Sequence, residues 1–378
     1  MLDSAICPHL RTQRSQPKST PASYEPAYPS YSARFDPSIS EVAAVLIGAI
    51  ASQPNSRLEH DALESVDHFL GQGSPQPHYR LLCNSEDPTG RETRAWKAYW
   101  PCKEDYLSWS SSSGFAAWWT ESKRETEEHG WLLEALYPTM DRLESVFSNE
   151  AAREGAALMC QGMSAAIEEH GYWGSARDRF PIAQTDTVPG EKVCPVKGML
   201  GGAKEANGTA SRRVVVPGRQ NLCVIHSGQD WSAMEGKERE LYLGTLHPTL
   251  QAGMLFLSND KYRSLDGDGS ASERVGCFEC RFMEHLDPER VEPSLSKSFG
   301  LCYFDDLASL ERWSREHKTH LNIFNGFFKY AAETQGQGKL SLWHEIAVLD
   351  RSQQYFEYVN CPPGTGMLAS VQKPIKDL

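Results

Sequence analysis

The sequence lacks a hydrophobic run long enough to span a membrane. The longest apolar stretch in the 378 residues is VAAVLIGAIA at 42–51, which also contains a glycine, whereas a transmembrane helix needs about 20 apolar residues. The N-terminus has no apolar segment before a small-residue cleavage site, so no secretory signal is predicted. We therefore expect a cytoplasmic protein that does not contact membranes.

Positive charge is also scarce. Lys and Arg number 38 against 50 Asp and Glu, which gives a net charge of −12 at pH 7, and no Lys/Arg-rich run occurs. Proteins that grip nucleic acid neutralise its phosphates with clustered basic side chains. We expect no nucleic-acid partner.

The ten cysteines do not have the spacing of a metal or disulfide framework. Cysteines scattered through a chain without a secretory signal are usually reduced thiols. Cys277 and Cys280 form one CxxC, but a zinc ribbon needs a second pair, and c-type haem attachment needs a histidine where Arg281 stands. The glycine-rich 198–208 lacks the Gly-Lys-Ser/Thr ending of a phosphate loop and is interpreted as a loop.

The length suits two to three domains at roughly 150 residues each, or two copies of one unit. Residues 1–38 are rich in Pro, Ser, Tyr and Arg without periodicity, which indicates an extended arm that wraps or stays mobile. We expect a first α+β unit with helical additions at 39–190, a glycine-rich loop at 191–212 and a second α+β unit at 213–378.

Hydrophobic periodicity predicts strand pairs alternating with helices, which is typical of an α+β fold. Helices are expected at 38–52, 58–71, 105–122, 231–258, 307–317 and 319–334. Strands are expected at 78–84, 93–100, 212–218, 221–228, 275–283, 298–304, 339–349 and 354–360. The stretches 129–148 and 149–171 are helix-compatible or mixed.

An internal similarity supports two copies of one unit. A shift of 204 residues brings AYW of the first half onto CYF of the second and Trp109 onto Trp313. A strand, a turn and a helix with a Trp then occur twice, as in duplicated ferredoxin-like units. The same shift places Ala116 opposite His320, so His320 is the position that departs from simple packing.

His320 lies on the apolar face of its predicted helix, together with Ile323, Phe324 and Phe327. A core histidine satisfied by a hydrogen bond is one interpretation. His317 completes an HxxH, but a zinc site would need further ligands. One imidazole among apolar side chains also suits a b-type haem, which needs an axial ligand and an apolar wall.

His344 lies at the centre of an aliphatic strand face formed by Leu340, Leu342, Ile346 and Val348. An ionisable group there is costly unless it has a partner or a function. Its ordinary pKa near 6.5 suits proton transfer at neutral pH. A structural histidine bonded to a backbone carbonyl is the alternative.

Two further polar positions are candidates. Ser227 ends a strand beside Gly228, where its hydroxyl can face a cavity, although Ser-Gly at a strand end is also ordinary turn chemistry. Arg177 and Arg179 lie in a dense charged and aromatic stretch, where a surface ion-pair cluster would contribute little stability.

Five stretches resemble the haem-containing aldoxime dehydratases, also called phenylacetaldoxime dehydratases. They run in the family's order and, with weaker similarity upstream, cover nearly the whole chain. Lys318 departs from the family pattern, and the loop near 190–211 is longer than in bacterial members. The stretches are EEHGYWGSARDRFPIAQTD (168–186), SGQDW (227–231), LERWSREHKTHLNIF (310–324), LWHE (342–345) and YFEYVNCPPGTGML (355–368).

The resemblance implies a lyase that converts an aldoxime, R-CH=N-OH, to a nitrile and water with the oxime nitrogen bound to ferrous haem b. It implies duplicated ferredoxin-like units forming a dimeric α+β barrel-like fold, and a homodimer. His320 would be the axial haem ligand. His344 would be the proton donor, and Ser227 and Arg179 would hold the oxime oxygen by hydrogen bonds.

Two other functions stay open at this stage. A haem peroxidase or monooxygenase on a related α+β barrel would consume peroxide or oxygen. A non-catalytic haem- or ligand-binding protein would use His320 and His344 only as core residues. Aldoxime turnover under nitrogen separates a dehydratase from the first alternative. A colourless, correctly folded preparation after growth with adequate haem would favour the second.

Overall fold

The computed structural model describes residues 2–192, 212–259 and 275–371. An eleven-stranded antiparallel sheet dominates them, with the strand order β6-β12-β9-β11-β10-β3-β4-β2-β5-β13-β8, and β1 pairs with β7 in a small second sheet. The strands are β1 (Ala33–Arg34), β2 (Ala43–Ile50), β3 (Tyr79–Glu86), β4 (Glu92–Trp100), β5 (Gly130–Leu136), β6 (Leu143–Phe147), β7 (Gly162–Met163), β8 (Arg213–Val216), β9 (Leu222–Asp230), β10 (Cys277–Asp287), β11 (Glu292–Phe304), β12 (Ser341–Leu349) and β13 (Gln354–Val359).

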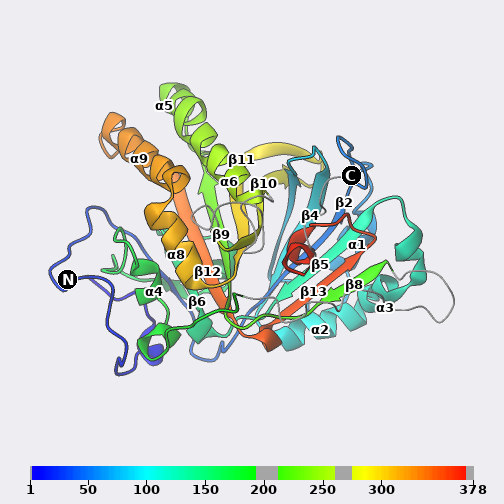
Figure 1. Ribbon diagram of the computed structural model, residues 1–378, viewed down its shortest axis with the longest axis horizontal. Coiled ribbons are helices and arrows are strands. Elements are labelled where there is room, and N and C mark those ends of the chain that lie inside the picture. Colours follow the sequence, from blue (N-terminus) through cyan, green and yellow to red (C-terminus); the bar gives the residue numbers. More distant parts are fainter. Residues whose placement is uncertain (1, 193–211, 260–274, 372–378) are drawn as a thin grey trace.

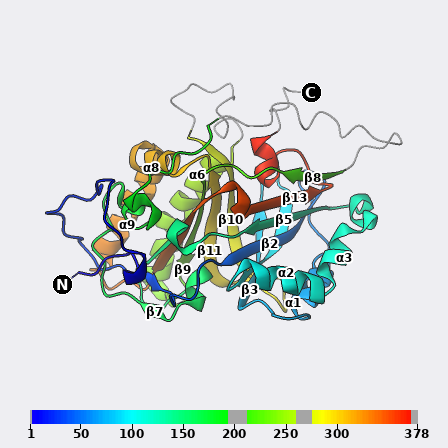
Figure 2. The same ribbon diagram turned by 90° about the horizontal axis from the view of Figure 1, so that it is seen from below.

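Two groups of helices lie at opposite ends of this sheet, as Figures 1 and 2 show. One group is α1 (Glu64–Leu70), α2 (Lys103–Ser112) and α3 (Phe115–Thr120). The other is α5 (Gly236–Leu241), α6 (His247–Ser258), α8 (Leu307–Glu316) and α9 (Lys318–Glu333), with a π-helical turn at Tyr242–Leu246 and the short α4 (Ser175–Asp178) nearby. The curled sheet with its helices confirms the predicted α+β class.

The buried side chains separate into layers because successive residues of a strand point to opposite faces of the sheet. One cluster joins residues from both halves of the sheet on one face, among them Leu132, Val224 and Leu301. On the other face, one cluster lies under α1, α2 and α3, and another lies under α6 and α8. The cavity described below lies beside the second of these clusters, under α6 and α8.

The two halves of the sheet meet where β10 pairs with β3. Strand pairing also crosses the expected boundary between the two units. Strand β6, from the first half of the chain, pairs with β12, whereas β13, from the second half, pairs with β5. The expected loop at 191–212 lies almost entirely outside the described residues.

The internal similarity corresponds to a repeated local structure. Strand β4 leads into α2, where Trp109 is buried, and β11 leads into α8, where Trp313 is buried. The following helices, α3 and α9, carry Ala116 and His320 at the matched positions. The imidazole therefore belongs to an element that occurs in both halves.

The prediction of a helix at 38–52 is wrong, and the two stretches interpreted as helix-compatible or mixed contain no α-helix. Residues 38–52 contain the strand β2, in which all eight residues are buried. A strand covered on both faces has a continuous apolar sequence, which periodicity cannot distinguish from a buried helix. The stretch 129–148 forms β5, whose seven residues are all buried in the same way, and the edge strand β6. The stretch 149–171 contains a short 3₁₀ turn and β7.

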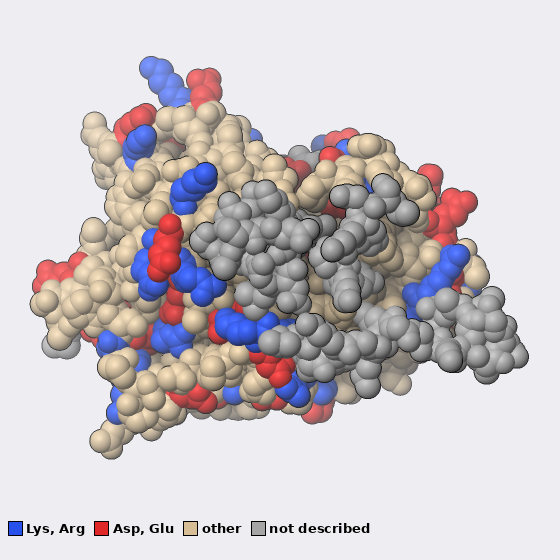
Figure 3. All heavy atoms as spheres, viewed as in Figure 1, with Lys and Arg blue, Asp and Glu red and all other residues tan. Residues whose placement is uncertain are grey.

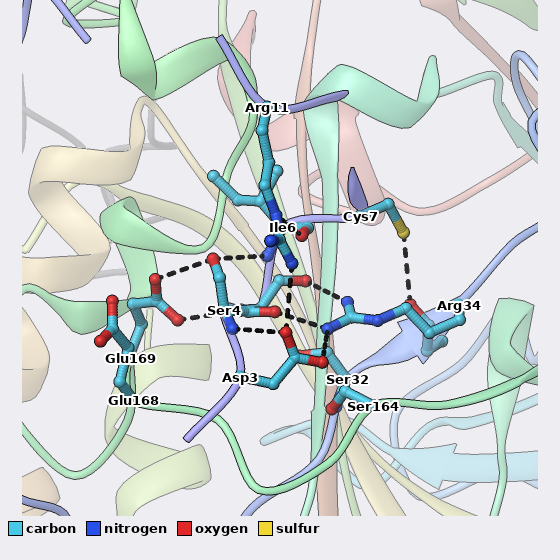
Figure 4. Close-up of polar contacts among 12 residues, drawn as sticks. Asp3, Ser4, Ile6, Cys7, Arg11, Ser32, Arg34, Ser164, Glu168 and Glu169 are labelled. Atoms are coloured by element: carbon cyan, nitrogen blue, oxygen red, sulfur yellow. Dashed lines mark hydrogen bonds and ion pairs between the residues drawn. The ribbon is translucent and has the colours of Figure 1, made fainter. Parts of the chain in front are cut away.

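Polar contacts hold the start of the N-terminal arm in place (Figure 4). The Ser4 hydroxyl donates to Oε1 of Glu169 at 3.0 Å, and the Ala5 amide donates to Oε2 at 2.8 Å. The Arg34 guanidinium lies 2.9 Å from the Asp3 carboxylate. Because the Glu169 side chain is fully buried, the contacts of Ser4 and Ala5 fix the arm to the segment that leads into α4.

On the face seen in Figure 3, Lys and Arg side chains stand beside Asp and Glu. No helix within the described ranges is long and apolar enough to cross a membrane.

Candidate functional site

A cavity of about 390 Å³ lies between the sheet and the helices α6, α8 and α9. Its size is within the usual range for small-molecule and cofactor sites. Its wall is largely apolar and aromatic, with a few polar side chains. Residues on the strand side include Ile225, Ser227, Cys302, Leu342, His344 and Ile346, and those on the helix side include Leu246, Leu250, Met254, Leu310, Trp313, His320, Ile323, Phe324 and Phe327.

His320 enters this cavity from the first turn of α9. The preceding His317 caps this helix, because its side chain accepts a hydrogen bond from the Thr319 amide. The His320 ring contacts Trp173 and Trp313 edge-on, with ring centroids 5.9 and 4.9 Å away. Its Nδ1 atom is buried and has no hydrogen-bond partner among the described residues. Burial lowers the pKa of His320 to about 4, so its imidazole is neutral at pH 7.

Ser227 and His344 occupy directly opposite positions on the neighbouring strands β9 and β12. Both line the cavity, so the pleat of the sheet points both side chains to the same face. The sequence assigned each residue to a strand, and the pairing register places them together. Ser227 also lies opposite Gly300 on its other side, in β11.

Arg179 directly follows α4 and is buried. Its Nε and Nη2 atoms donate to the two carboxylate oxygens of Glu144 at 2.6 and 3.2 Å. Its Nη1 atom donates to the carbonyl of Glu169 at 2.9 Å and to the hydroxyl of Ser175 at 3.3 Å. Nη2 also lies 2.9 Å from Nε2 of His344. Arg179 therefore belongs to a buried network and not to a surface ion-pair cluster.

Glu144 is the central member of this network, and no sequence pattern had singled it out. Its Oε1 atom lies 3.1 Å from Nε2 of His344, and the carboxylate is almost completely buried. Burial alone would raise the pKa of Glu144, but the positive charge of Arg179 and the interaction with His344 lower it below its ordinary value. The cavity thus has a buried carboxylate anion directly behind its histidine.

His170 is a third histidine on the cavity wall that sequence reasoning did not select. Its Nε2 atom is buried without a hydrogen-bond partner in the described part of the chain, and burial lowers its pKa to about 4. Tyr28 of the N-terminal arm packs against this ring, with centroids 5.2 Å apart. Its place in the HGYWG segment, shortly before Arg179, was the available signal.

The other residues considered in the sequence, Arg177 and the Cys277–Cys280 pair, do not line this cavity. Arg177 pairs with Glu311 at 2.8 Å. Cys277 and Cys280 begin β10, and the described residues contain no group of three or more His, Cys, Asp or Glu side chains placed to hold a metal ion.

The cavity fits a haem on its own chemistry. A neutral imidazole on an apolar helix face is a suitable axial ligand, and the aromatic and aliphatic side chains around it suit the macrocycle. His320 supplies the imidazole, and Ile323, Phe324 and Phe327 extend the apolar wall along α9. Fold and site thus define an α+β protein with a largely apolar cavity that has one histidine on its helix side and another on its sheet side.

Comparisons with known proteins place the chain in a family. Residues 46–367 match the model of the haem-containing dehydratases, and the chain belongs to this family. It is 36% identical over 369 residues to an aliphatic aldoxime dehydratase of Rhodococcus erythropolis, with 97% of this chain and 98% of the relative covered. It is 28% identical over 366 residues to a phenylacetaldoxime dehydratase of Bacillus sp. (strain OxB-1), covering 95% and 97%.

A crystal structure of an aldoxime dehydratase in complex with butyraldoxime has a similar fold. It superimposes with a TM-score of 0.83 at 33% identity and covers 98% of this chain and 97% of the other. The family assignment and the α+β class predicted from the sequence are therefore confirmed. The comparisons do not assign roles to individual side chains, and these roles are inferred from contacts and burial.

Proposed function

We propose that this protein is a lyase that dehydrates aldoximes to nitriles and water. The observation that carries this proposal is the single cavity lined by His320 from α9 and by His344 and Ser227 from the sheet. The named activities of the relatives support the reaction class, and the butyraldoxime complex of the similar structure supports an aliphatic aldoxime as substrate.

His320 would hold the haem iron, and the apolar side chains of α6 and α9 that line the cavity would surround the cofactor. When bound in the ferrous state, a haem b supplies an iron that can coordinate the oxime nitrogen and donate electron density to it. The neutral state of His320 leaves a nitrogen lone pair for the metal without loss of a proton.

His344 is the proton donor in this proposal. Its Nε2 atom faces Glu144 and Arg179, and its Nδ1 makes no hydrogen bond within the described ranges, so Nδ1 can exchange a proton with a molecule in the cavity. In the protonated imidazole, Nε2–H donates to Glu144 and Nδ1–H points to the oxime hydroxyl. Protonation turns that hydroxyl into water, which is a good leaving group, and the neutral ring can then accept the hydrogen of the aldoxime carbon.

Ser227 and Arg179 have different tasks. The Ser227 hydroxyl, directly opposite His344, can donate to the oxime oxygen and orient it. Arg179 already donates to Glu144, Glu169 and Ser175, so we propose that it acts by fixing Glu144 and His344. The aliphatic neighbours of His344 keep bulk water away from the transferred proton.

The proposal also covers the number of chains, the type of haem and the oxidation state of its iron. We propose a homodimer with one haem b per chain, active in the ferrous form, on the strength of the family resemblance. Sedimentation of the haem-loaded protein measures the number of chains. The cytoplasmic location stays a prediction.

Anaerobic turnover tests the function. The purified haem-loaded protein is reduced with dithionite under nitrogen, and butyraldoxime or phenylacetaldoxime is added while the Soret band and the nitrile are followed. We expect a Soret shift on mixing and nitrile formation without peroxide or oxygen. Absence of nitrile from a fully reduced, haem-loaded sample would overturn the proposal, as would equal rates for ferric and ferrous protein.

A further inference from the structure

Two cysteines lie directly opposite each other beneath the cavity. Cys280 of β10 pairs with Cys302 of β11 in the antiparallel register. Their Sγ atoms are 3.0 Å apart, and both residues are 3% exposed. Cys302 lines the cavity that holds His320, whereas Cys280 lines a neighbouring cavity of about 880 Å³.

We propose that Cys280 and Cys302 are a modification site, at which a small hydroperoxide converts the thiol pair to a reversible cross-strand disulfide. Directly opposite residues of antiparallel strands have Cα atoms about 4.5–5.5 Å apart. A disulfide needs roughly 4.4–6.8 Å. The bond can therefore form without movement of the strands.

The reaction proceeds in two steps. A hydroperoxide that reaches the Cys302 thiol on the cavity wall oxidises it to a sulfenic acid, as the O–O bond breaks and the peroxide leaves as water or an alcohol. The Cys280 sulfur then attacks the Cys302 sulfur, forming the S–S bond and releasing water. Two thiols have lost two electrons and two protons, which reduce the hydroperoxide, and an added dithiol restores the pair.

The surroundings explain why the pair stays reduced in the absence of an oxidant. The Cys280 thiol and burial hold the pKa of Cys302 well above its ordinary value, so it is protonated at neutral pH. A protonated thiol reacts slowly. Oxidation then depends on a reagent small enough to enter a cavity, and the adjacent thiol captures the sulfenic acid.

The partner of Cys280 differs from the one that the CxxC spacing suggested. The Sγ atom of Cys277 donates to the Glu279 carbonyl at 3.2 Å, whereas Cys280 faces Cys302 across the strands. The Sγ atom of Cys280 also lies 3.7 Å from Sδ of Met254, which lines both cavities. Disulfide formation thus alters the sulfur contacts in the wall between the two cavities.

Thiol counting and peptide mapping test the proposal. The haem-loaded protein is treated with excess hydrogen peroxide, denatured, alkylated and digested, with and without dithiothreitol. We expect the ten thiols of the chain to fall by two, and a peptide that links Cys280 to Cys302 to appear. Dithiothreitol should return both thiols.

Two variants make the result specific. Cys302→Ser should abolish the linked peptide. Cys83→Ser is the matched control, because Cys83 is equally buried but donates to the Ala95 carbonyl on a different strand pair, and it should leave the link unchanged.

Peptide mapping of the oxidised parent protein, without any substitution, tests the disulfide even when a variant fails to fold. Retention of ten thiols, a link to Cys277 instead of Cys302, or irreversible sulfinic acid at Cys302 would each overturn the proposal. Activity is not needed for this readout, so a failure here is distinct from a failure of the proposed dehydratase function.

Discussion

Nε2 of His344 lies 3.1 Å from the buried carboxylate of Glu144. The same nitrogen is 2.9 Å from Nη2 of Arg179, so it faces both an acceptor and a donor. The ring can donate to Glu144 when it is protonated, and it can accept from Arg179 when Nε2 has no proton. This arrangement suits a group that must give up a proton and take one back.

Replacement of His344 tests the proton transfer. His344→Ala should keep the haem, because His320 is unchanged, but should dehydrate aldoximes at least ~100-fold more slowly, within the ~10²–10⁴ usual for a general acid. Stopped-flow formation of nitrile measures the rate, and the Soret absorbance measures the haem. Near-normal turnover would contradict the role of His344.

Replacement of His320 tests the axial ligand. His320→Ala removes the imidazole of α9, and we expect the protein to purify without haem while its circular dichroism stays that of the parent. The haem-to-protein absorbance ratio is the measurement. A variant with the full Soret absorbance would assign the ligand to another residue.

Glu144→Gln tests the buried anion behind His344. The amide keeps the shape but loses the charge, so the ring of His344 loses the carboxylate 3.1 Å from its Nε2 atom and is held less well. Turnover should fall by about 10–100-fold, the range for loss of a group that orients a functional side chain. Glu357→Gln is the control. It neutralises a buried carboxylate that lies 2.7 Å from the partly buried Arg213, far along the sheet, and turnover should be retained.

Gly228, next to Ser227, permits the close approach of an indole. A Cβ atom at Gly228 would lie 2.3 Å from Cε2 of Trp343, and this buried ring cannot easily move. We expect Gly228→Ala to lower the free energy of unfolding by about 1–3 kcal/mol. Gly253→Ala would meet only the mobile end of Ile323, at 2.7 Å, and urea denaturation should show a smaller loss.

Two buried histidines of the sheet, His226 in β9 and His285 in β10, predict that the folded protein loses stability in acid. Burial lowers the pKa of His226 to about 4 and that of His285 to about 3. Both are near 6.5 in the unfolded chain. As the pH falls below 6.5, the unfolded chain binds protons that the folded protein does not, so stability is full above pH 6.5 and decreases toward pH 4.

Urea denaturation at two pH values measures this effect. The free energy of unfolding should be lower at pH 5 than at pH 7 by about 2 kcal/mol per buried histidine. In His226→Asn the difference between the two pH values should be smaller than in the parent. An unchanged difference would show that folding does not lower the pKa of His226.

The sequence by itself determined the helices and strands that have one apolar face and one polar face. The apolar face of α9 identified His320, the alternation of β12 identified His344, and the repeat of a Trp after each strand predicted the duplicated unit. These signals are local, because side-chain direction follows from the periods of helix and strand. Family-specific strings added the reaction class, which the comparisons confirmed.

Only the tertiary structure decided the rest. Strands β2 and β5 are buried on both faces, so their sequences have no alternation and resemble helices. Glu144 is an ordinary residue of LESVF until strand pairing places it beside Arg179 and His344. Cys280 acquires Cys302 as a neighbour through the register of β10 and β11, not through the CxxC spacing. Contacts between distant segments depend on register and burial, which no local period encodes.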